Sequence, residues 1–251
     1  VSYIGNLDPT PILLKGLKRL EYRGYDSAGI ALLDKNNLYH IKRAGNVSDL
    51  HSQVDTLLAK GSLGIAHTRW ATHGVPNDIN AHPHLDQTGR IALVHNGIIE
   101  NYGAIKETLI GRGVSFTSDT DSEVLVQLIS ELYYNNDKKL NFEDAVKAAL
   151  QEVVGAYGIV AICVDEPGKM VAARMGSPLV LGVGDGEYLL ASDASPIIDY
   201  TRSVIYLEDD EFVKIDHSGY EISNIRSADV ITKTLTKIDL SIEEIEKGEF
   251  P

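Results

Sequence analysis

The fold class is indicated most clearly by residues 118–165, SDTDSEVLVQLISELYYNNDKKLNFEDAVKAALQEVVGAYGIVAICVD. Its first part predicts an amphipathic helix whose apolar stripe is Val124, Leu125, Leu128, Ile129 and Leu132. Its middle part predicts a second helix, capped by Asn141, whose stripe is Phe142, Ala145, Val146, Ala149 and Val153. A β-rich run begins at Ala156. Two successive helices followed by a strand break the alternation that a doubly wound parallel sheet requires.

Strand-like runs lie on both sides of this stretch. They are rich in Val, Ile, Leu and Tyr, end in turn residues, and cover 1–5, 27–34, 38–45, 63–70, 90–97, 156–165, 169–175, 178–193 and 211–216. A helix is predicted over 8–24, with Pro11 early and Gly24 after its end. This order favours an α+β fold in which antiparallel sheets carry helices on their outer faces.

The glycine-rich run GVGDG, residues 182–186, has two interpretations. A dinucleotide fingerprint must open a helix, but the strand-like YLLASD follows here. Asp185-Gly186 between two apolar runs is instead a hairpin signal. We therefore predict a hairpin and no nucleotide site.

Composition excludes several classes of function. The net charge of −13 over 251 residues argues against nucleic acid or an anionic membrane as partner. No apolar run is long enough to span a bilayer, so we expect a soluble protein. Cys163 is the single cysteine, so no internal disulfide can form, and a reducing, cytoplasmic location is expected. Its apolar surroundings predict a buried core thiol.

Polar residues gather around Arg69 and Trp70 at the end of a predicted strand. The arginine could clamp a carboxylate beside a tryptophan that closes over a ligand, or form a surface ion pair beside a core tryptophan. Nearby histidines could suggest zinc, namely His67, His73, His82 and His84. Their spacing does not match helical metal-binding geometry, and no second cysteine helps, so no metal site is predicted.

Two further motifs have a structural and a functional interpretation. Asn96-Gly97 is typical of a hairpin turn, but the following residues look helical, with Ile98 and Ile99 on the apolar side. At such a strand-to-helix junction the amide and a backbone N–H could bind an oxyanion. SDTDSE, residues 118–123, is typical of a helix N-cap, although Asp121 could also receive an ammonium group.

Together these groups describe a site for an amino acid with a reactive carbonyl. The guanidinium suits a carboxylate, the carboxylate suits an ammonium, and the amide pair suits an oxyanion. EYRGYDSAG, residues 21–29, contains Ser27 but not a hydrolase elbow, and reads as a turn into a strand with Arg23 in a structural role. No nucleophile is evident.

Five strings carry a resemblance to a known family: LEYRGYDSAG (20–29), GIAHTRWATHG (64–74), NAHPH (80–84), VHNGIIENY (94–102) and SDTDSE (118–123). In this order the chain closely resembles the glutaminase domains of class II glutamine amidotransferases, from its first residue to about Asp239. The resemblance implies a four-layer α/β/β/α sandwich of two antiparallel sheets, the N-terminal-nucleophile hydrolase fold. It implies a glutaminase domain over 1–238 and, over 239–251, the start of a linker to a C-terminal sugar-phosphate isomerase region.

The resemblance also implies roles for individual residues. Arg69 binds the α-carboxylate of L-glutamine and Asp121 its α-ammonium, while Trp70 lies on the loop that closes over the ligand. Asn96 and Gly97 form the oxyanion hole. The remaining residues carried over are Thr72 and His73, which line the pocket, and Arg23, which lies near the nucleophile. No cofactor and no metal are implied.

The family nucleophile is the first residue of a Cys-Gly-Ile-Val-Gly-Tyr-Ile-Gly start. This chain matches from Val1, with Ser2 in place of the usual glycine, so the resemblance places the cysteine three residues before Val1. The implied partners are the isomerase domain, fructose 6-phosphate through that domain, and a second copy in a homodimer. The alternatives are the glutaminase domain of another class II amidotransferase, for purine, asparagine or glutamate synthesis, and a glutamine-binding module without a nucleophile.

Overall fold

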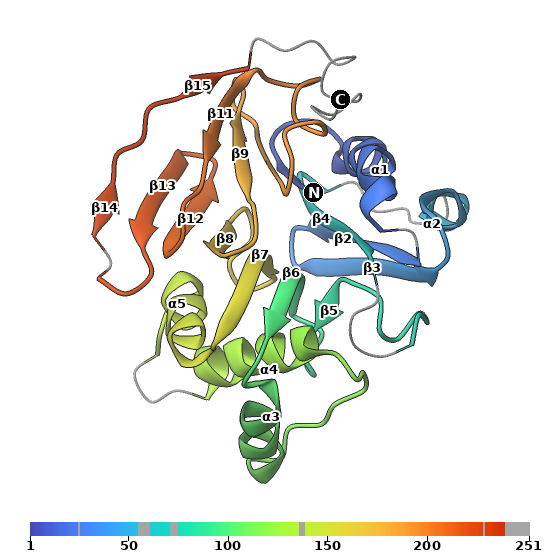
Figure 1. The fold of residues 1–251 in the computed structure, drawn as a ribbon, viewed down its shortest axis with the longest axis vertical. Helices are drawn as coiled ribbons and strands as arrows, with labels where there is room; N and C mark the ends of the chain where they lie inside the picture. Colours follow the sequence, from blue (N-terminus) through green and yellow to red (C-terminus); the bar gives the residue numbers. More distant parts are fainter. Residues whose placement is uncertain (25, 55–60, 71–74, 136–138, 228, 239–251) are drawn as a thin grey trace, which may run out of the picture.

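The computed structural model describes residues 1–24, 26–54, 61–70, 75–135, 139–227 and 229–238. Thr72, His73 and the predicted linker over 239–251 lie outside the described residues. The described residues form two antiparallel sheets that pack face to face, with helices on the outer faces (Figure 1). The expected four-layer sandwich is therefore confirmed.

The first sheet holds the start of the chain near its centre. Its strand order is β15 (Thr236–Lys237), β11 (Ser203–Tyr206), β9 (Val180–Val183), β10 (Tyr188–Ala191), β1 (Ser2–Ile4), β4 (Leu63–Arg69), β2 (Ser27–Asp34) and β3 (Asn37–Ala44). β1 pairs with β10 on one side and with β4 on the other, where Ser2 lies opposite Ile65. The chain therefore begins inside the sheet and not at its edge.

The second sheet is built mainly from the C-terminal half of the chain. Its order is β14 (Val230–Ile231), β13 (Gly219–Asn224), β12 (Glu211–Asp216), β8 (Met170–Met175), β7 (Gly155–Cys163), β6 (Ile91–Ile99) and β5 (His84–Leu85). The longest ladder joins β6 to β7, from Ile91 opposite Cys163 to Ile99 opposite Gly155. Cys163 is buried, as expected, and burial raises the pKa of its thiol to about 11.

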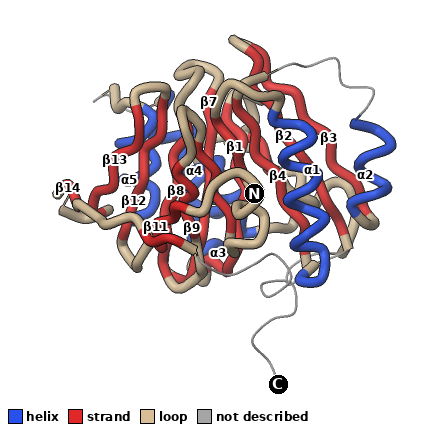
Figure 2. Tube along the Cα trace, turned by 90° about the horizontal axis from the view of Figure 1, so that it is seen from above, coloured by secondary structure: helices blue, strands red, loops and turns tan. Residues whose placement is uncertain are grey.

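The helices cover the outer faces of the sheets. α1 (Pro9–Leu20), the short 3₁₀ helix η1 (Glu21–Arg23) and α2 (Val47–Val54) belong to the first sheet, whereas α4 (Asp121–Tyr134) and α5 (Phe142–Glu152) cover the second. Figure 2 shows α1 and α2 beside β2, β3 and β4, and α5 beside β12 and β13. α3 (Tyr102–Gly111) packs against α4. In the part of the chain described, no helix is both long and apolar enough to cross a membrane.

Three apolar layers hold the sandwich together. Ile30 and Leu32 of β2 face α1 and α2, while Ala31 and Leu33 of the same strand face the second sheet. The third layer lies between the second sheet and helices α4 and α5, around Phe142 and Phe212. Because both faces of the sheets are covered, their strands read as continuous apolar runs instead of alternating ones.

The structure confirms some expectations and corrects one. Asn141 caps α5, its side chain accepting a hydrogen bond from Asp144 N, and Asp185-Gly186 lies in the hairpin between β9 and β10. The predicted helical start at Ile98 and Ile99 is wrong, because both residues belong to β6 and pair with β7. The helix begins only at Tyr102. Asn96-Gly97 therefore lies within a strand and not at a turn or junction.

Candidate active site

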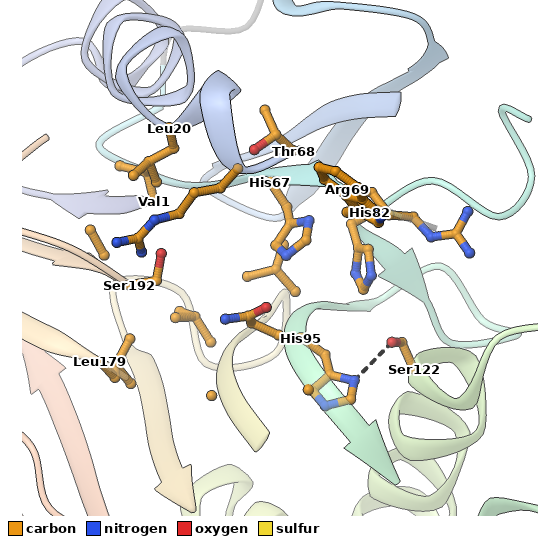
Figure 3. Close-up of a pocket in the computed structure, with 18 of the residues that line it drawn as sticks. Val1, Leu20, His67, Thr68, Arg69, His82, His95, Ser122, Leu179 and Ser192 are labelled. Atoms are coloured by element: carbon orange, nitrogen blue, oxygen red, sulfur yellow. Dashed lines mark hydrogen bonds between the residues drawn. The ribbon is translucent and has the colours of Figure 1, made fainter. Parts of the chain in front are cut away.

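One pocket of about 370 Å³ opens where β4 ends and β1 begins. It reaches from the first sheet across to the second, so its walls come from segments that are far apart in the sequence (Figure 3). The residues predicted from the sequence that line it are Arg23, Arg69, Trp70, Asn96, Gly97 and Asp121. Every predicted site residue that the structure describes thus meets at one place.

Arg69 and Trp70 form one wall of the pocket, at the end of β4. The side chain of Arg69 is buried, which contradicts the surface ion-pair interpretation. Burial lowers the pKa of its guanidinium, while the charges of Asp26 and Asp121 oppose that shift. Trp70 is 62% exposed, so it is not a core tryptophan but lies at the pocket rim.

Asn96 and Gly97 reach the pocket from β6 of the opposite sheet. Gly97 has φ +140°, and a Cβ at this position would lie 2.0 Å from the carbonyl oxygen of Ala156. Only glycine fits this conformation so close to β7. The neighbouring Asn96 is exposed where it lines the pocket. A side-chain amide and a backbone N–H are therefore held next to each other at one wall.

Asp121 enters the pocket from the first turn of α4. The cap of this helix is Thr120, whose side chain accepts a hydrogen bond from Glu123 N. The carboxylate of Asp121 instead accepts the backbone N–H of Ile99 at 2.8 Å. This bond fixes the helix start to the end of β6, three residues after Asn96. Asp121 is thus not needed as the cap, and its carboxylate lines the pocket.

Sequence reasoning did not assign the pocket histidines to the amino-acid site. His95 lies next to Asn96, and its Nδ1 is 2.9 Å from the Oγ of Ser122 (Figure 3). Burial lowers the pKa of His95, opposed by the charge of Asp121. His67 and His82 also line the pocket, although their sequence spacing was weighed only as a metal site. The signal available in the sequence was His95, which stands between an apolar run and Asn96-Gly97.

Arg23 has a structural partner at the pocket mouth. Its guanidinium donates a hydrogen bond to Asp193 at 2.7 Å, which links η1 to the segment after β10. Ser27 is the first residue of β2 and donates to Asp26, as expected for a turn into a strand. Arg23 lines the pocket while Ser27 does not.

The arrangement has a clear polarity. A buried guanidinium lies on the β4 wall and a buried carboxylate on the α4 wall, and Asn96 and Gly97 of β6 line the same pocket. Such a pocket complements a small zwitterion that carries a carbonyl group farther along its chain.

Residues 52–215 match the family model of the glutamine amidotransferase domain, which is more than half of the chain. The chain belongs to the glutamine amidotransferase domain family.

Individual relatives with a named activity match this chain over its whole length. The chain is 51% identical to glutamine–fructose-6-phosphate aminotransferase (isomerizing) of Chlorobaculum tepidum and 48% identical to the enzyme of that name from Bacteroides thetaiotaomicron. Each match covers 100% of this chain and 41% of the relative. The chain therefore spans about two fifths of the length of these relatives.

Solved structures show the same fold. Glutamine phosphoribosylpyrophosphate amidotransferase from B. subtilis, complexed with ADP and GMP, superposes with a TM-score of 0.77 at 25% identity. The match covers 90% of this chain and 49% of that one. This places the sandwich with the N-terminal-nucleophile hydrolases.

Proposed function

We propose that this chain binds L-glutamine in the pocket and, with a cysteine three residues before Val1 as nucleophile, hydrolyses its side-chain amide and releases ammonia. The observation that carries the proposal is the meeting of Arg69, Asp121 and Asn96-Gly97, from three separate elements, in one cavity. Their chemistry matches the two ends of an amino acid and its reacting carbonyl.

The two charged residues fix the amino-acid end of glutamine. The guanidinium of Arg69 pairs with the α-carboxylate, and the carboxylate of Asp121 accepts from the α-ammonium. Both side chains are buried, at 6% exposure each, so the ion pairs form in a site of low dielectric. In our proposal Thr72 and His73 line the same pocket, Trp70 covers it and Arg23 lies near the nucleophile.

The strand β6 supplies the electrostatic part of the catalysis. When a nucleophile attacks the amide carbon, negative charge develops on the carbonyl oxygen. The side chain of Asn96 and the backbone N–H of Gly97 donate to that oxyanion. One such donor typically contributes about 100- to 1,000-fold in rate.

The register of β1 supports a nucleophile ahead of Val1. Val1 N donates to the carbonyl oxygen of Ala66, and Ala66 N donates to that of Val1, both at 2.8 Å. Continued by the same pairing, the third residue before Val1 lies opposite Arg69. It shares its face of the strand with Ser2 and Ile4, and Ile4 packs between the sheets, on the side of Asn96.

A cysteine at that place has the chemistry that the reaction needs. Its thiol is intrinsically nucleophilic but mostly protonated near neutral pH. As the first residue it carries a free α-amine, whose ordinary pKa is about 7.7–8.0, and this amine accepts the thiol proton. The thiolate attacks the amide carbon, ammonia leaves, and water hydrolyses the resulting thioester to glutamate.

We further propose that the glutaminase domain, residues 1–238, passes ammonia to a C-terminal isomerase domain. That domain forms glucosamine 6-phosphate from fructose 6-phosphate, in a homodimer and in the cytoplasm. The relatives at 51% and 48% identity carry a name that fits this reaction, whereas the glutamine phosphoribosylpyrophosphate amidotransferase of B. subtilis matches at 25%. The single cysteine and the charge of −13 support the location and argue against nucleic-acid or membrane partners.

The test compares two versions of the chain, one that begins Cys-Gly-Ile before Val1 and a matched one that begins Ala-Gly-Ile. We expect the first to release glutamate from L-glutamine and the second to be slower by at least about 1,000-fold. Absence of release from the cysteine version contradicts the proposal. If the full-length protein releases glutamate but forms no glucosamine 6-phosphate from fructose 6-phosphate, the glutaminase role stands and the sugar substrate is wrong.

A further inference from the structure

Three imidazole rings lie side by side across the site, two of them buried (His82 and His84) and one partly buried (His67). The rings of His67 and His82 lie 4.3 Å apart, centroid to centroid, and those of His82 and His84 lie 4.8 Å apart, edge to face. At the far end, Nε2 of His84 lies 3.1 Å from the Oγ1 of Thr120. We call these three residues the histidine stack. It runs from β4 of the first sheet to the cap of α4 on the second.

The two ends of the stack adjoin the two charged residues of the pocket. His67 lies two positions before Arg69 on β4, and Thr120 directly precedes Asp121. A rigid stack therefore sets the distance between the strand end that carries the guanidinium and the helix start that carries the carboxylate.

The middle of the stack is fixed by the backbone of β2. Gly29 pairs with His67 in the sheet, and a Cβ on Gly29 would lie 2.1 Å from the carbonyl oxygen of His82. The glycine thus lets the chain at His82 lie directly on the first sheet. Two residues later His84 enters the second sheet, opposite Leu93. The residues from His82 to His84 bridge both sheets.

We propose that His82 is a positioning residue, whose uncharged ring, stacked between His67 and His84, holds Arg69 and Asp121 at the separation that L-glutamine requires. This inference rests on the proposed function, since it concerns the amino-acid end of the same pocket. His82 acts through its neighbours and takes no part in the chemical step.

The groups around the histidine stack disfavour a positive charge on its rings. The Nδ1 atoms of His67 and His82 are buried without a hydrogen-bond partner among the described residues, so a second proton there has no acceptor. The charged or titratable groups that face the rings are cationic or neutral: Arg69 of β4, Lys42 of β3 and His95 of β6.

The pKa values of the three histidines are shifted in the direction that keeps the rings neutral. Burial lowers the pKa of all three stack histidines, that of His67 to about 3, and the nearby cations lower them further. No group of three or more His, Cys, Asp or Glu in the described ranges is arranged to hold a metal ion. The stack is therefore suited to packing as uncharged rings.

The experiment measures L-glutamine binding by calorimetry, at pH 7.5, in the chain that begins at Val1 and in three variants at one position. We expect His82→Ala to weaken binding at least about 10-fold, because the stack loses its middle ring. His82→Phe restores binding to within about 3-fold, because it keeps an aromatic ring. His82→Lys weakens binding at least about 10-fold, because it brings a charge beside Arg69.

The matched control is Phe142→Leu, which removes volume from the core between α5 and the second sheet. It lowers the free energy of unfolding but leaves glutamine binding unchanged. If His82→Ala binds like the parent, the positioning role is wrong; if His82→Phe binds as poorly as His82→Ala, ring stacking is wrong. A lysine variant that binds like the phenylalanine variant overturns the requirement for neutrality. A parent chain that binds no glutamine contradicts the proposed function, and the inference with it.

A second measurement needs no ligand. The ¹⁵N shifts of the imidazole nitrogens report whether each ring is charged. We expect His67, His82 and His84 to stay neutral at pH 5.5. A protonated His82 at pH 5.5 overturns the inference.

Discussion

At the scale of residues, each charged group of the pocket is held in place by a different interaction. Arg69 is fixed by its place at the end of β4, within reach of the charge of Asp26. Asp121 is fixed by the hydrogen bond from Ile99 N. Preorganised groups of this kind interact with a ligand without paying for their own reorientation.

The kinetic predictions for Asp121 and Asn96 concern the version that begins Cys-Gly-Ile before Val1. The substitution Asp121→Asn tests the charge of this residue without changing its position. The asparagine side chain still offers an oxygen to Ile99 N but has no charge for the α-ammonium. We expect KM for L-glutamine to rise about 10- to 100-fold, since a hydrogen bond to a charged group contributes about 1.5–3 kcal/mol. Steady-state kinetics measure this, with the urea midpoint as a control for folding. An unchanged KM removes the ammonium-binding role.

The substitution Asn96→Ala tests the oxyanion hole. Because the amide acts on charge that develops in the transition state, we expect kcat to fall about 100- to 1,000-fold with a smaller change in KM. Single-turnover measurement of glutamate release separates this step from product release. A variant with the kcat of the parent contradicts the oxyanion role of Asn96.

At the scale of elements, the start of α4 carries more interactions than one cap. Thr120 accepts from Glu123 N, while the carboxylate of Glu123 accepts from the backbone N–H groups of Thr117 and Ser118. Glu123 is buried, so these bonds organise the whole segment before the helix. The same motif therefore serves as an N-cap and presents Asp121 to the pocket.

Replacement of the cap residue tests this element. Thr120→Val keeps the shape but loses the hydroxyl that accepts from Glu123 N and bonds His84. We expect the free energy of unfolding to fall by about 1–2 kcal/mol. Thr120→Ser keeps the hydroxyl and serves as the matched control. Urea unfolding of both variants checks the prediction, and equal midpoints contradict it.

At the scale of the whole molecule, buried neutral histidines make the fold sensitive to acid. The stack histidines have folded-state pKa values below the ordinary 6.5, that of His67 at about 3. Below pH 6.5 the unfolded chain binds protons that the folded chain does not. The free energy of unfolding therefore falls as the pH falls through this window.

Urea unfolding between pH 7.5 and 5.5 measures this dependence. We expect little change above pH 7 and a loss below pH 6.5 that approaches about 1.4 kcal/mol per pH unit for each such histidine. Most carboxylates stay ionised at pH 5.5, so the histidines dominate the change. A free energy of unfolding that stays constant from pH 6.5 to 5.5 contradicts the prediction.

Local patterns predicted part of the architecture, and the misses have physical reasons. The apolar stripe of residues 124–132 and the Asn141 cap predicted two helices. The observed bounds of α4 and α5 agree with them to within a few residues. The strand β6 was cut short because Asn96-Gly97 reads locally as a turn, whereas pairing with β7 keeps the chain extended to Ile99. The short strands β11 and β13 and the helix α2 lack a strong local pattern and owe their form to packing.

Motifs and local periodicity were enough to predict the family, the helices of residues 118–152 and the residue types of the amino-acid site. The tertiary structure brings Arg69, Asp121 and Asn96 into one pocket, although they come from β4, α4 and β6. It also brings the rings of His67, His82 and His84 side by side. Distances between residues far apart in sequence depend on sheet register and layer packing, which no local pattern encodes.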